Sequence, residues 1–306
     1  MDPQQGLNGA MDVPIPTATP FAAAAPPPFL VRSPPVQSAP LVFASPHSGR
    51  RYSPEFLAAS RLDATALRRS EDSFVDELFG SAPDHGAPLI TATFPRAYCD
   101  PNREMWELDP AMFSDVLPPW VNTSSARVGA GLGTIARVVA SGEAIYRRKL
   151  RFTEAKERIN ACWVPYHQAL AGLLAATQAR FGACLLVDCH SMPANGATKP
   201  GRGAPDIVLG DAHGTACAPS ITKWIEQALS GFGYDVRRND PYAGGYVTRH
   251  YGRPRDGGHA IQIEIARGLY MDEARFERSP AFALLQTRLS SLVAGLAAAV
   301  PALLQP

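Results

Sequence analysis

The sequence lacks a charge imbalance, a long apolar run and any internal repeat. Its 306 residues carry a formal net charge of +1 at pH 7, which argues against nucleic-acid binding because nucleic-acid-binding domains present a basic face. No apolar run reaches the roughly 18 residues that a membrane-spanning helix needs. We therefore expect a small-molecule substrate, with neither nucleic acid nor membrane as a partner. Nothing in the pattern indicates an oligomeric state.

The sequence also lacks paired cysteines and the GxSxG turn of many serine hydrolases. No CxxC spacing occurs among its five scattered cysteines: Cys99, Cys162, Cys184, Cys189 and Cys217. An odd and scattered set predicts reduced thiols in a cytoplasmic protein rather than a disulfide framework.

The first 40 residues differ in composition from the rest of the chain. They contain ten prolines, seven alanines and three charged residues, a composition that disfavours helices and sheet hydrogen bonding. We predict a disordered tail over residues 1–39 and a single catalytic hydrolase domain over residues 40–306. Removal of residues 1–38 is accordingly expected to leave melting temperature and activity nearly unchanged.

From residue 40 onward, strand patterns alternate with helical patterns. Strands are predicted over residues 41–45, 88–94, 183–192, 206–209, 235–238 and 260–265. Helices are predicted over residues 64–79, 143–181 with a break near Arg151, 219–229 and 280–300. Such alternation is typical of one α/β domain with a largely parallel or mixed sheet. Residues 106–140 are predicted to form a long loop, which in a compact domain is usually functional or poorly ordered.

Three of the predicted strands end in groups that bind metals or carry protons. The first strand ends beside His47, the third carries Asp188 and His190 on one face, and the sixth carries Glu264. Open α/β sheets bind ligands at the carboxyl ends of their strands, and a carboxylate beside an imidazole can orient a metal-bound histidine. A polar strand end without a ligand is the alternative for each strand taken singly.

This set suits zinc chemistry. A catalytic zinc site needs three protein ligands and an open position for water, and His47 and His190 would supply two of them, with a carboxylate as the third. Glu264 is suited to accept a proton from the zinc-activated water and to return it to the leaving amine. His167, alone on a predicted helix, is expected to be a packing residue.

Six short motifs follow one another between about residues 40 and 290. They are Pro46-His47-Ser48-Gly49, Glu71-Asp72-Ser73, Arg96 with Asp100-Pro101-Asn102-Arg103, Tyr166-His167, Gly244-Gly245-Tyr246-Val247-Thr248-Arg249, and Gln262-Ile263-Glu264 with Tyr270-Met271-Asp272. In this order they resemble the N-formylglutamate amidohydrolases. The resemblance implies cleavage of N-formyl-L-glutamate to L-glutamate and formate, a last step of histidine breakdown. It also implies kinship with zinc carboxypeptidases and acyl-amino-acid deacylases, whose phosphorylase/hydrolase-like fold holds a mixed sheet between helices.

The resemblance further implies roles for individual residues. His47, Asp72 and His190 would be the ligands of Zn²⁺, and Glu264 would be the general base. Asp72 lies 25 positions after His47, whereas carboxypeptidase-like sites usually place the carboxylate three positions after the first histidine. Glu71 is therefore an alternative third ligand.

Four residues are left to bind the substrate: Arg96, Asn102, Arg103 and Arg249. N-Formylglutamate carries two carboxylates, and guanidinium pairs with a carboxylate through two parallel hydrogen bonds. The alternative for each arginine is a structural ion pair.

Three other functions remain open. The same chemistry could act on another N-acyl amino acid or a short peptide, a choice that depends on pocket size. A non-catalytic module that binds small acids or metals would not need Glu264. A serine or cysteine hydrolase would use Ser191 or Cys189 with His190, although neighbouring residues on a strand point to opposite faces.

Overall fold

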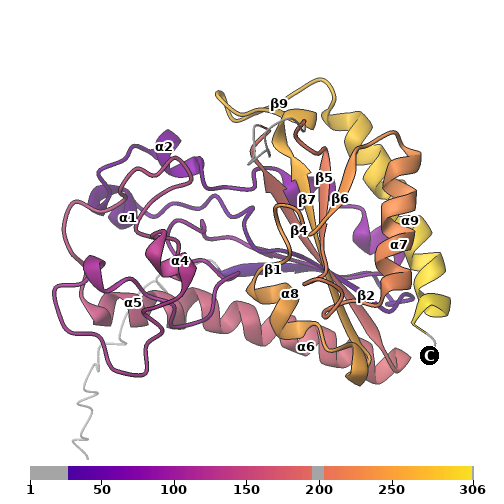
Figure 1. Cartoon of the computed structure of the whole chain (residues 1–306), viewed down its shortest axis with the longest axis horizontal. Helices are drawn as coiled ribbons and strands as arrows, with labels where there is room; N and C mark the ends of the chain where they lie inside the picture. The colour runs from indigo at the N-terminus through magenta and orange to yellow at the C-terminus, as the bar shows by residue number, and fades with distance from the viewer. Residues whose placement is uncertain (1–26, 195–202, 305–306) are drawn as a thin grey trace, which may run out of the picture.

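All six predicted strands form, and a seventh joins them at one edge. The computed structural model of the protein describes residues 27–194 and 203–304, and its main sheet has the order β1-β3-β2-β4-β7-β5-β6 (Figure 1). The strands are β1 (Phe29–Arg32), β2 (Leu41–Ser45), β3 (Leu89–Ala92), β4 (Cys184–Met192), β5 (Ile207–Gly210), β6 (Val236–Arg238) and β7 (Gly258–Ala266). Pairing is parallel except where β1 meets β3 and β5 meets β7. The prediction of a mixed, largely parallel sheet in one α/β domain is confirmed.

Helices occupy most of the connections. They are α1 (Pro54–Ala59), α2 (Ala64–Arg68), α3 (Val75–Leu78), α4 (Ala126–Gly129), α5 (Phe152–Arg158), α6 (Val164–Phe181), α7 (Pro219–Gly231), α8 (Tyr246–Tyr251) and α9 (Phe282–Leu303). Short 3-10 turns cover Ala82–His85, Pro110–Met112, Pro254–Asp256 and Arg267–Leu269, and a π-helical turn covers Ile159–Trp163. A small hairpin joins β8 (Met271–Asp272) and β9 (Glu277–Arg278).

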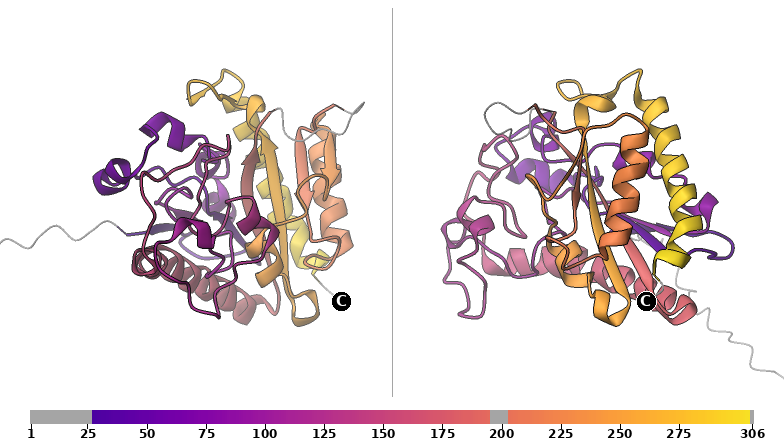
Figure 2. Two further views of the ribbon diagram at one scale, coloured as in Figure 1. Left: turned by 60° about the vertical axis from the view of Figure 1, so that its left-hand side comes forward. Right: turned by 45° about the vertical axis from the view of Figure 1, so that its right-hand side comes forward.

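The sheet separates two apolar layers. Figures 1 and 2 show α7 and α9 on one face and α6 on the other, with the loops of residues 50–150 beside the sheet. Leu41 and Phe43 of β2 pack toward the side of α9, and Val42 and Ala44 pack toward the side of α6. This alternation follows from the two-residue period of a strand, and it buries both faces of β2.

The face toward α6 changes from apolar to polar along the two central strands. On β4, Leu186 belongs to the core and is followed on the same face by Asp188 and His190. On β7, Ala260 is followed in the same way by Gln262 and Glu264. Since β4 and β7 are parallel neighbours in register, their polar ends lie side by side in the centre of the sheet.

The ordered chain begins earlier than residue 40, so the predicted tail boundary at residue 39 is wrong. Strand β1 pairs antiparallel with β3 over Phe29–Arg32, and Gln37 donates a hydrogen bond to Thr177 of α6. The outer edge of β3 offers backbone groups that this short segment satisfies, despite its proline-rich surroundings. Residues 1–26 lie outside the described residues.

The predicted helices differ from the observed ones mainly at their boundaries. Residues 64–79 form two short helices, α2 and α3, because Asp72 turns out of the helical path between them and Phe74 takes a left-handed conformation with φ 65°. The helix predicted over residues 143–181 begins only at Phe152, close to the break expected near Arg151. Helix α9 runs past Pro301 instead of ending there.

Helix α9 is long and apolar enough to cross a membrane by length and composition. Its buried residues include Leu285, Leu289, Leu292 and Val293, which pack into the core beside α7. Their spacing of three and four residues forms one apolar stripe. Packing on the sheet therefore accounts for the composition of this helix.

Strand β1 should contribute measurably to stability. We expect a protein that lacks residues 1–38 to melt roughly 5 °C or more below one that lacks residues 1–26, because it loses the β1–β3 pairing and the Gln37 contact; about 1 kcal/mol corresponds to 2–4 °C in a domain of this size. Thermal unfolding of the two truncated proteins makes the comparison. Equal melting temperatures would mean that β1 adds nothing to the fold.

Candidate active site

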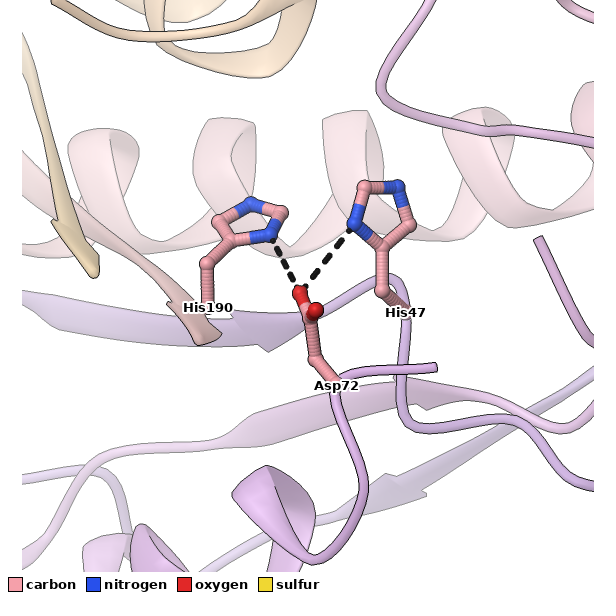
Figure 3. A group of neighbouring side chains, drawn as sticks. All are labelled: His47, Asp72 and His190. Atoms are coloured by element: carbon pink, nitrogen blue, oxygen red, sulfur yellow. Dashed lines mark hydrogen bonds and ion pairs between the residues drawn. The ribbon is translucent and has the colours of Figure 1, made fainter. Parts of the chain in front are cut away.

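Three side chains from separate segments converge at the polar end of the sheet. His47 follows β2, Asp72 lies between α2 and α3, and His190 is part of β4. Asp72 Oδ2 lies 3.3 Å from His47 Nδ1 and 3.0 Å from His190 Nδ1 (Figure 3). All three residues are at most 2% exposed, and their donor atoms lie within 4.8 Å of one another.

Hydrogen bonds between the two loops bring Asp72 to His47. The backbone N–H of Asp72 donates to the carbonyl of His47 at 3.1 Å. Ser48 Oγ donates to the carbonyl of Asp72 at 3.2 Å and accepts from the backbone N–H of Asp76 at 3.1 Å. These contacts place a carboxylate beside an imidazole that is 25 residues away in the sequence.

The outer nitrogen of each imidazole faces a second carboxylate. His47 Nε2 lies 2.7 Å from Asp100 Oδ1. His190 Nε2 lies 2.9 Å from Asp188 Oδ1 and 3.1 Å from the amide of Asn102. Carboxylates in this position fix the tautomer and orientation of histidines that bind metals. The orienting role suggested for Asp188 by its place two residues before His190 agrees with this geometry.

The donor set fits a divalent cation. Two imidazole nitrogens and a carboxylate oxygen are ligands that zinc binds, and a cation placed between them would contact all three. Donors bound tetrahedrally to zinc at about 2.0–2.2 Å lie roughly 3.3–3.5 Å apart. The two contacts of Asp72 Oδ2, at 3.0 and 3.3 Å, are close to that spacing. The residues present could therefore hold a metal ion.

Arg267 holds the other oxygen of Asp72. Its Nη2 lies 3.1 Å from Asp72 Oδ1, and its Nε donates to Ser191 Oγ at 3.1 Å. Burial on its own would raise the pKa of Asp72, but hydrogen bonds and attraction from His190 and His47 hold it well below its usual range. Asp72 is thus an anion whose orientation Arg267 fixes.

Arg96 has the corresponding role for Asp100. Its Nε and Nη2 donate to Asp100 Oδ2 at 3.2 and 2.8 Å. Burial would raise the pKa of Asp100, yet attraction from Arg96, His47 and Arg103 keeps it well below its usual range. The guanidinium predicted to bind substrate is therefore engaged with the carboxylate that orients His47.

Asn102 likewise supports the histidines. Its Oδ1 accepts from the backbone N–H of Val247 at 2.8 Å, which directs its Nδ2 toward His190. A Cβ at residue 245 would lie 2.4 Å from the Asn102 amide, so only glycine fits at Gly245. His167 is a packing residue, as predicted, and its Nε2 lies 2.8 Å from the carbonyl of Pro101.

Glu264 lies beside this group and is aimed by its neighbour on β7. Its Cα is paired in register with that of His190, and its Oε1 accepts from Gln262 Nε2 at 2.6 Å. Gln262 is itself fixed, because its Oε1 accepts from the backbone N–H of Gly245 at 2.8 Å. Burial raises the pKa of Glu264 to about 7, and the charge of Asp72 adds to the rise while His190 and Arg96 oppose it. A carboxyl with this pKa can both accept and release a proton near neutral pH.

These residues line one cavity of about 390 Å³. That volume is at the lower end of the range for small-molecule sites. Besides His47, His190 and Glu264, the wall includes guanidinium groups at two depths. Arg103 is buried, whereas Arg249 and Arg127 of α4 are exposed. The cavity therefore combines a candidate metal site, a carboxyl and several cations.

Two groups that the sequence left as alternatives, Glu71 and Cys189, lie elsewhere. Glu71 accepts hydrogen bonds from Tyr52, Arg68 and Ser73, so Asp72 rather than Glu71 faces the histidines. Cys189 is buried in the core with its sulfur 3.5 Å from the carbonyl of Val187. Its pKa is raised well above the usual value, chiefly by burial.

Sequence reasoning missed the parts of the site that lie outside the strand-end pattern. It gave no role to Asp100, Arg267 or Arg127. Arg267 directly follows β7, so a wider search of strand ends would have found it. Arg127 lies in an irregular loop, where no periodicity marks it. The five cysteines are all free, as expected.

Known proteins resemble this chain over most of its length. The family model described as N-formylglutamate amidohydrolase matches residues 39–271. The chain is 32% identical to a protein of Pseudomonas aeruginosa named N-formylglutamate deformylase over 76% of its own length and 83% of the relative's. A Pseudomonas putida protein with the same name is 29% identical over 76% of this chain and 82% of the relative.

A crystal structure agrees with these matches. The N-formylglutamate amidohydrolase from Ralstonia eutropha JMP134 superposes with a TM-score of 0.85 at 39% identity, covering 89% of this chain and 98% of that one. The family model, the two relatives and the solved structure all indicate the same family. The chain belongs to the N-formylglutamate amidohydrolase family.

Proposed function

We propose that the protein is a zinc-dependent amidohydrolase that cleaves N-formyl-L-glutamate into L-glutamate and formate. The observation that carries the proposal is the convergence of His47, Asp72 and His190 at a cavity that His47, His190 and Glu264 line. The names of the Pseudomonas relatives and of the Ralstonia structure support the choice of substrate. With this activity the enzyme would serve histidine breakdown in the cytoplasm.

His47, Asp72 and His190 would hold the metal. Zinc bound there would acidify a water molecule and polarise the formyl carbonyl. Asp100 and Asp188 keep the two imidazoles oriented with Nδ1 toward Asp72, and Arg267 prevents the Asp72 carboxylate from rotating. The ligands are thus set in place before the substrate arrives, and no reorganisation is needed during the reaction.

Glu264 would move the proton. Its carboxylate accepts a proton from the attacking water as the new C–O bond forms at the formyl carbon. The same carboxyl then donates that proton to the amide nitrogen as the C–N bond breaks, which releases formate and glutamate. The hydrogen bond from Gln262 leaves the second carboxyl oxygen of Glu264 available for this transfer.

Arg103 would bind the α-carboxylate of the substrate. Its Nε and Nη1 donate to the carbonyls of Leu132 and Asn102 at 2.8 Å each. Its Nη2 lies 3.9 Å from Asp100 Oδ2, and Arg103 lines the cavity. The guanidinium is therefore held rigidly by the backbone with one edge available to a ligand.

A serine or cysteine hydrolase finds less support. Both ring nitrogens of His190 already face Asp72 and Asp188, so this ring is not free to activate Ser191. Ser191 Oγ accepts from Arg267 instead. The buried, hydrogen-bonded Glu264 also favours catalysis over a module that only binds acids or metals.

The protein purified without chelator should contain one zinc ion per chain. Asp72→Asn should reduce bound zinc well below one equivalent, whereas Glu71→Gln, a matched change at the adjacent carboxylate, should retain it. Elemental analysis of the three proteins measures the metal. A full zinc equivalent in Asp72→Asn, or a metal-free wild type whose activity resists chelators, would contradict the metal proposal.

Glu264→Gln should lower kcat by on the order of 10²–10⁴, the usual contribution of general acid–base catalysis. Zinc content and melting temperature should stay close to those of the wild type, because the amide keeps the shape of the carboxyl. Turnover of N-formylglutamate at steady state tests this. A variant with nearly native turnover would remove Glu264 from the mechanism.

Arg103→Ala should cost about 2–4 kcal/mol in kcat/KM, because a charge-assisted contact and the orientation of the substrate are both lost. Since Arg103 is assigned to the α-carboxylate, Arg103→Ala should lower kcat/KM equally for N-formylglutamate and N-formylalanine. Arg103→Lys should recover only part of the lost kcat/KM, because ammonium keeps the charge without the planar fork of guanidinium. Melting curves separate this loss from damage to the fold, and full activity of Arg103→Ala would reject the role.

A further inference from the structure

The two carboxylates of the proposed substrate lie at different distances from the bond that breaks. The α-carboxylate is attached to the carbon that bears the amide nitrogen, whereas the side-chain carboxylate lies beyond two methylene groups. An enzyme that holds the formyl group at its metal site must therefore bind the α-carboxylate deep in the cavity. The side-chain carboxylate must be bound nearer the rim.

Arginine side chains line both the buried part and the exposed part of the cavity. Arg103 is buried and adjoins Asp100, which contacts His47. Arg127 and Arg249 line the same cavity and are exposed. Among the residues that the structure describes, neither of these two side chains forms a hydrogen bond or an ion pair. They are the wall's unengaged guanidinium groups, whereas Arg96 and Arg267 are bound to Asp100 and Asp72.

Arg127 and Arg103 line the same cavity, and the positive charge of Arg127 acts on Arg103. Burial lowers the pKa of Arg103 to about 10, and repulsion by Arg96 and Arg127 adds to the effect while Asp100 opposes it. Asp100 is already shared by His47 and Arg96. Arg103 and Arg127 therefore place two positive charges on the wall of this cavity, which a ligand with two carboxylates would neutralise.

The loop that carries Arg127 is fixed to the same wall. Ser125 caps α4 by accepting a hydrogen bond from the backbone N–H of Val128 at 3.1 Å, and its hydroxyl donates to Glu107. The carbonyl of Leu132, a few residues later, accepts from Arg103. Arg127 and Arg103 are thus connected through one loop and line the same cavity.

We propose that Arg127 binds the side-chain carboxylate of the substrate and is the residue that selects acidic N-formyl amino acids. This inference rests on the proposed function and names the residue that sets its specificity. Arg103 holds the α-carboxylate common to all N-formyl amino acids. Arg127 binds the side-chain carboxylate, because its guanidinium has no other partner in the described chain and lines the same cavity, on the loop whose Leu132 carbonyl holds Arg103.

The test compares N-formylglutamate with N-formylglutamine, which has the same shape but a neutral side chain. Arg127→Ala should lower kcat/KM for N-formylglutamate by roughly 10–100-fold, the usual effect of losing a hydrogen bond to a charged group. The loss should appear mainly in KM, and kcat/KM for N-formylglutamine should change by less than about threefold. The preference for glutamate over glutamine then disappears. Arg127→Lys should keep part of the preference for N-formylglutamate, because lysine keeps the positive charge.

Arg255→Ala is the matched control, since Arg255 is exposed and precedes β7 at the end opposite Glu264. It should leave both substrates unaffected. Arg249→Ala tests the other exposed arginine of the cavity. If Arg249→Ala removes the preference and Arg127→Ala does not, or if Arg127→Ala lowers activity on both substrates equally, the inference is overturned. A wild type that cleaves neither substrate would instead overturn the proposed function.

Discussion

The convergence of His47, Asp72 and His190 is the constraint on which the rest of the site depends. Two imidazole nitrogens and a carboxylate oxygen, each from a residue nearly inaccessible to water, lie within 4.8 Å of one another, and this is the donor set of a catalytic zinc site. The surrounding residues keep the donors in this position. Asp100 and Asp188 orient the imidazoles, and Arg267 orients the carboxylate. The two histidines and Asp72 are therefore surrounded by a second layer of charged side chains.

The fold supplies this geometry through its sheet. Parallel pairing of β4 with β7 brings His190 beside Glu264, and parallel pairing of β2 with β4 brings the loop of His47 to the same edge. The apolar residues earlier on these strands bury the sheet against α6 and thereby fix the strand ends. The long loop of residues 106–140 then closes one wall and brings Arg127 to it.

The sequence predicted the parts of the structure that depend on local patterns. Strand alternation and chain order are sufficient to bring His47, His190 and Glu264 to one edge of a sheet. Asp72 could not be placed in this way, because it interrupts a helical pattern and its position depends on a hydrogen bond to the His47 carbonyl. Strand β1 escaped notice because four residues between prolines form a strand only when β3 offers an edge. Arg127 depends on tertiary contacts, whereas Arg267 directly follows β7 and was within reach of a wider search of strand ends.

The central claim is that a metal ion binds where the three donors meet. Anomalous diffraction from crystals of the zinc-loaded protein, measured on both sides of the zinc absorption edge, tests it most directly. The account predicts one strong peak per chain, coordinated by Nδ1 of His47, Nδ1 of His190 and a carboxylate oxygen of Asp72. No peak there, or a peak bound through other residues, would contradict it.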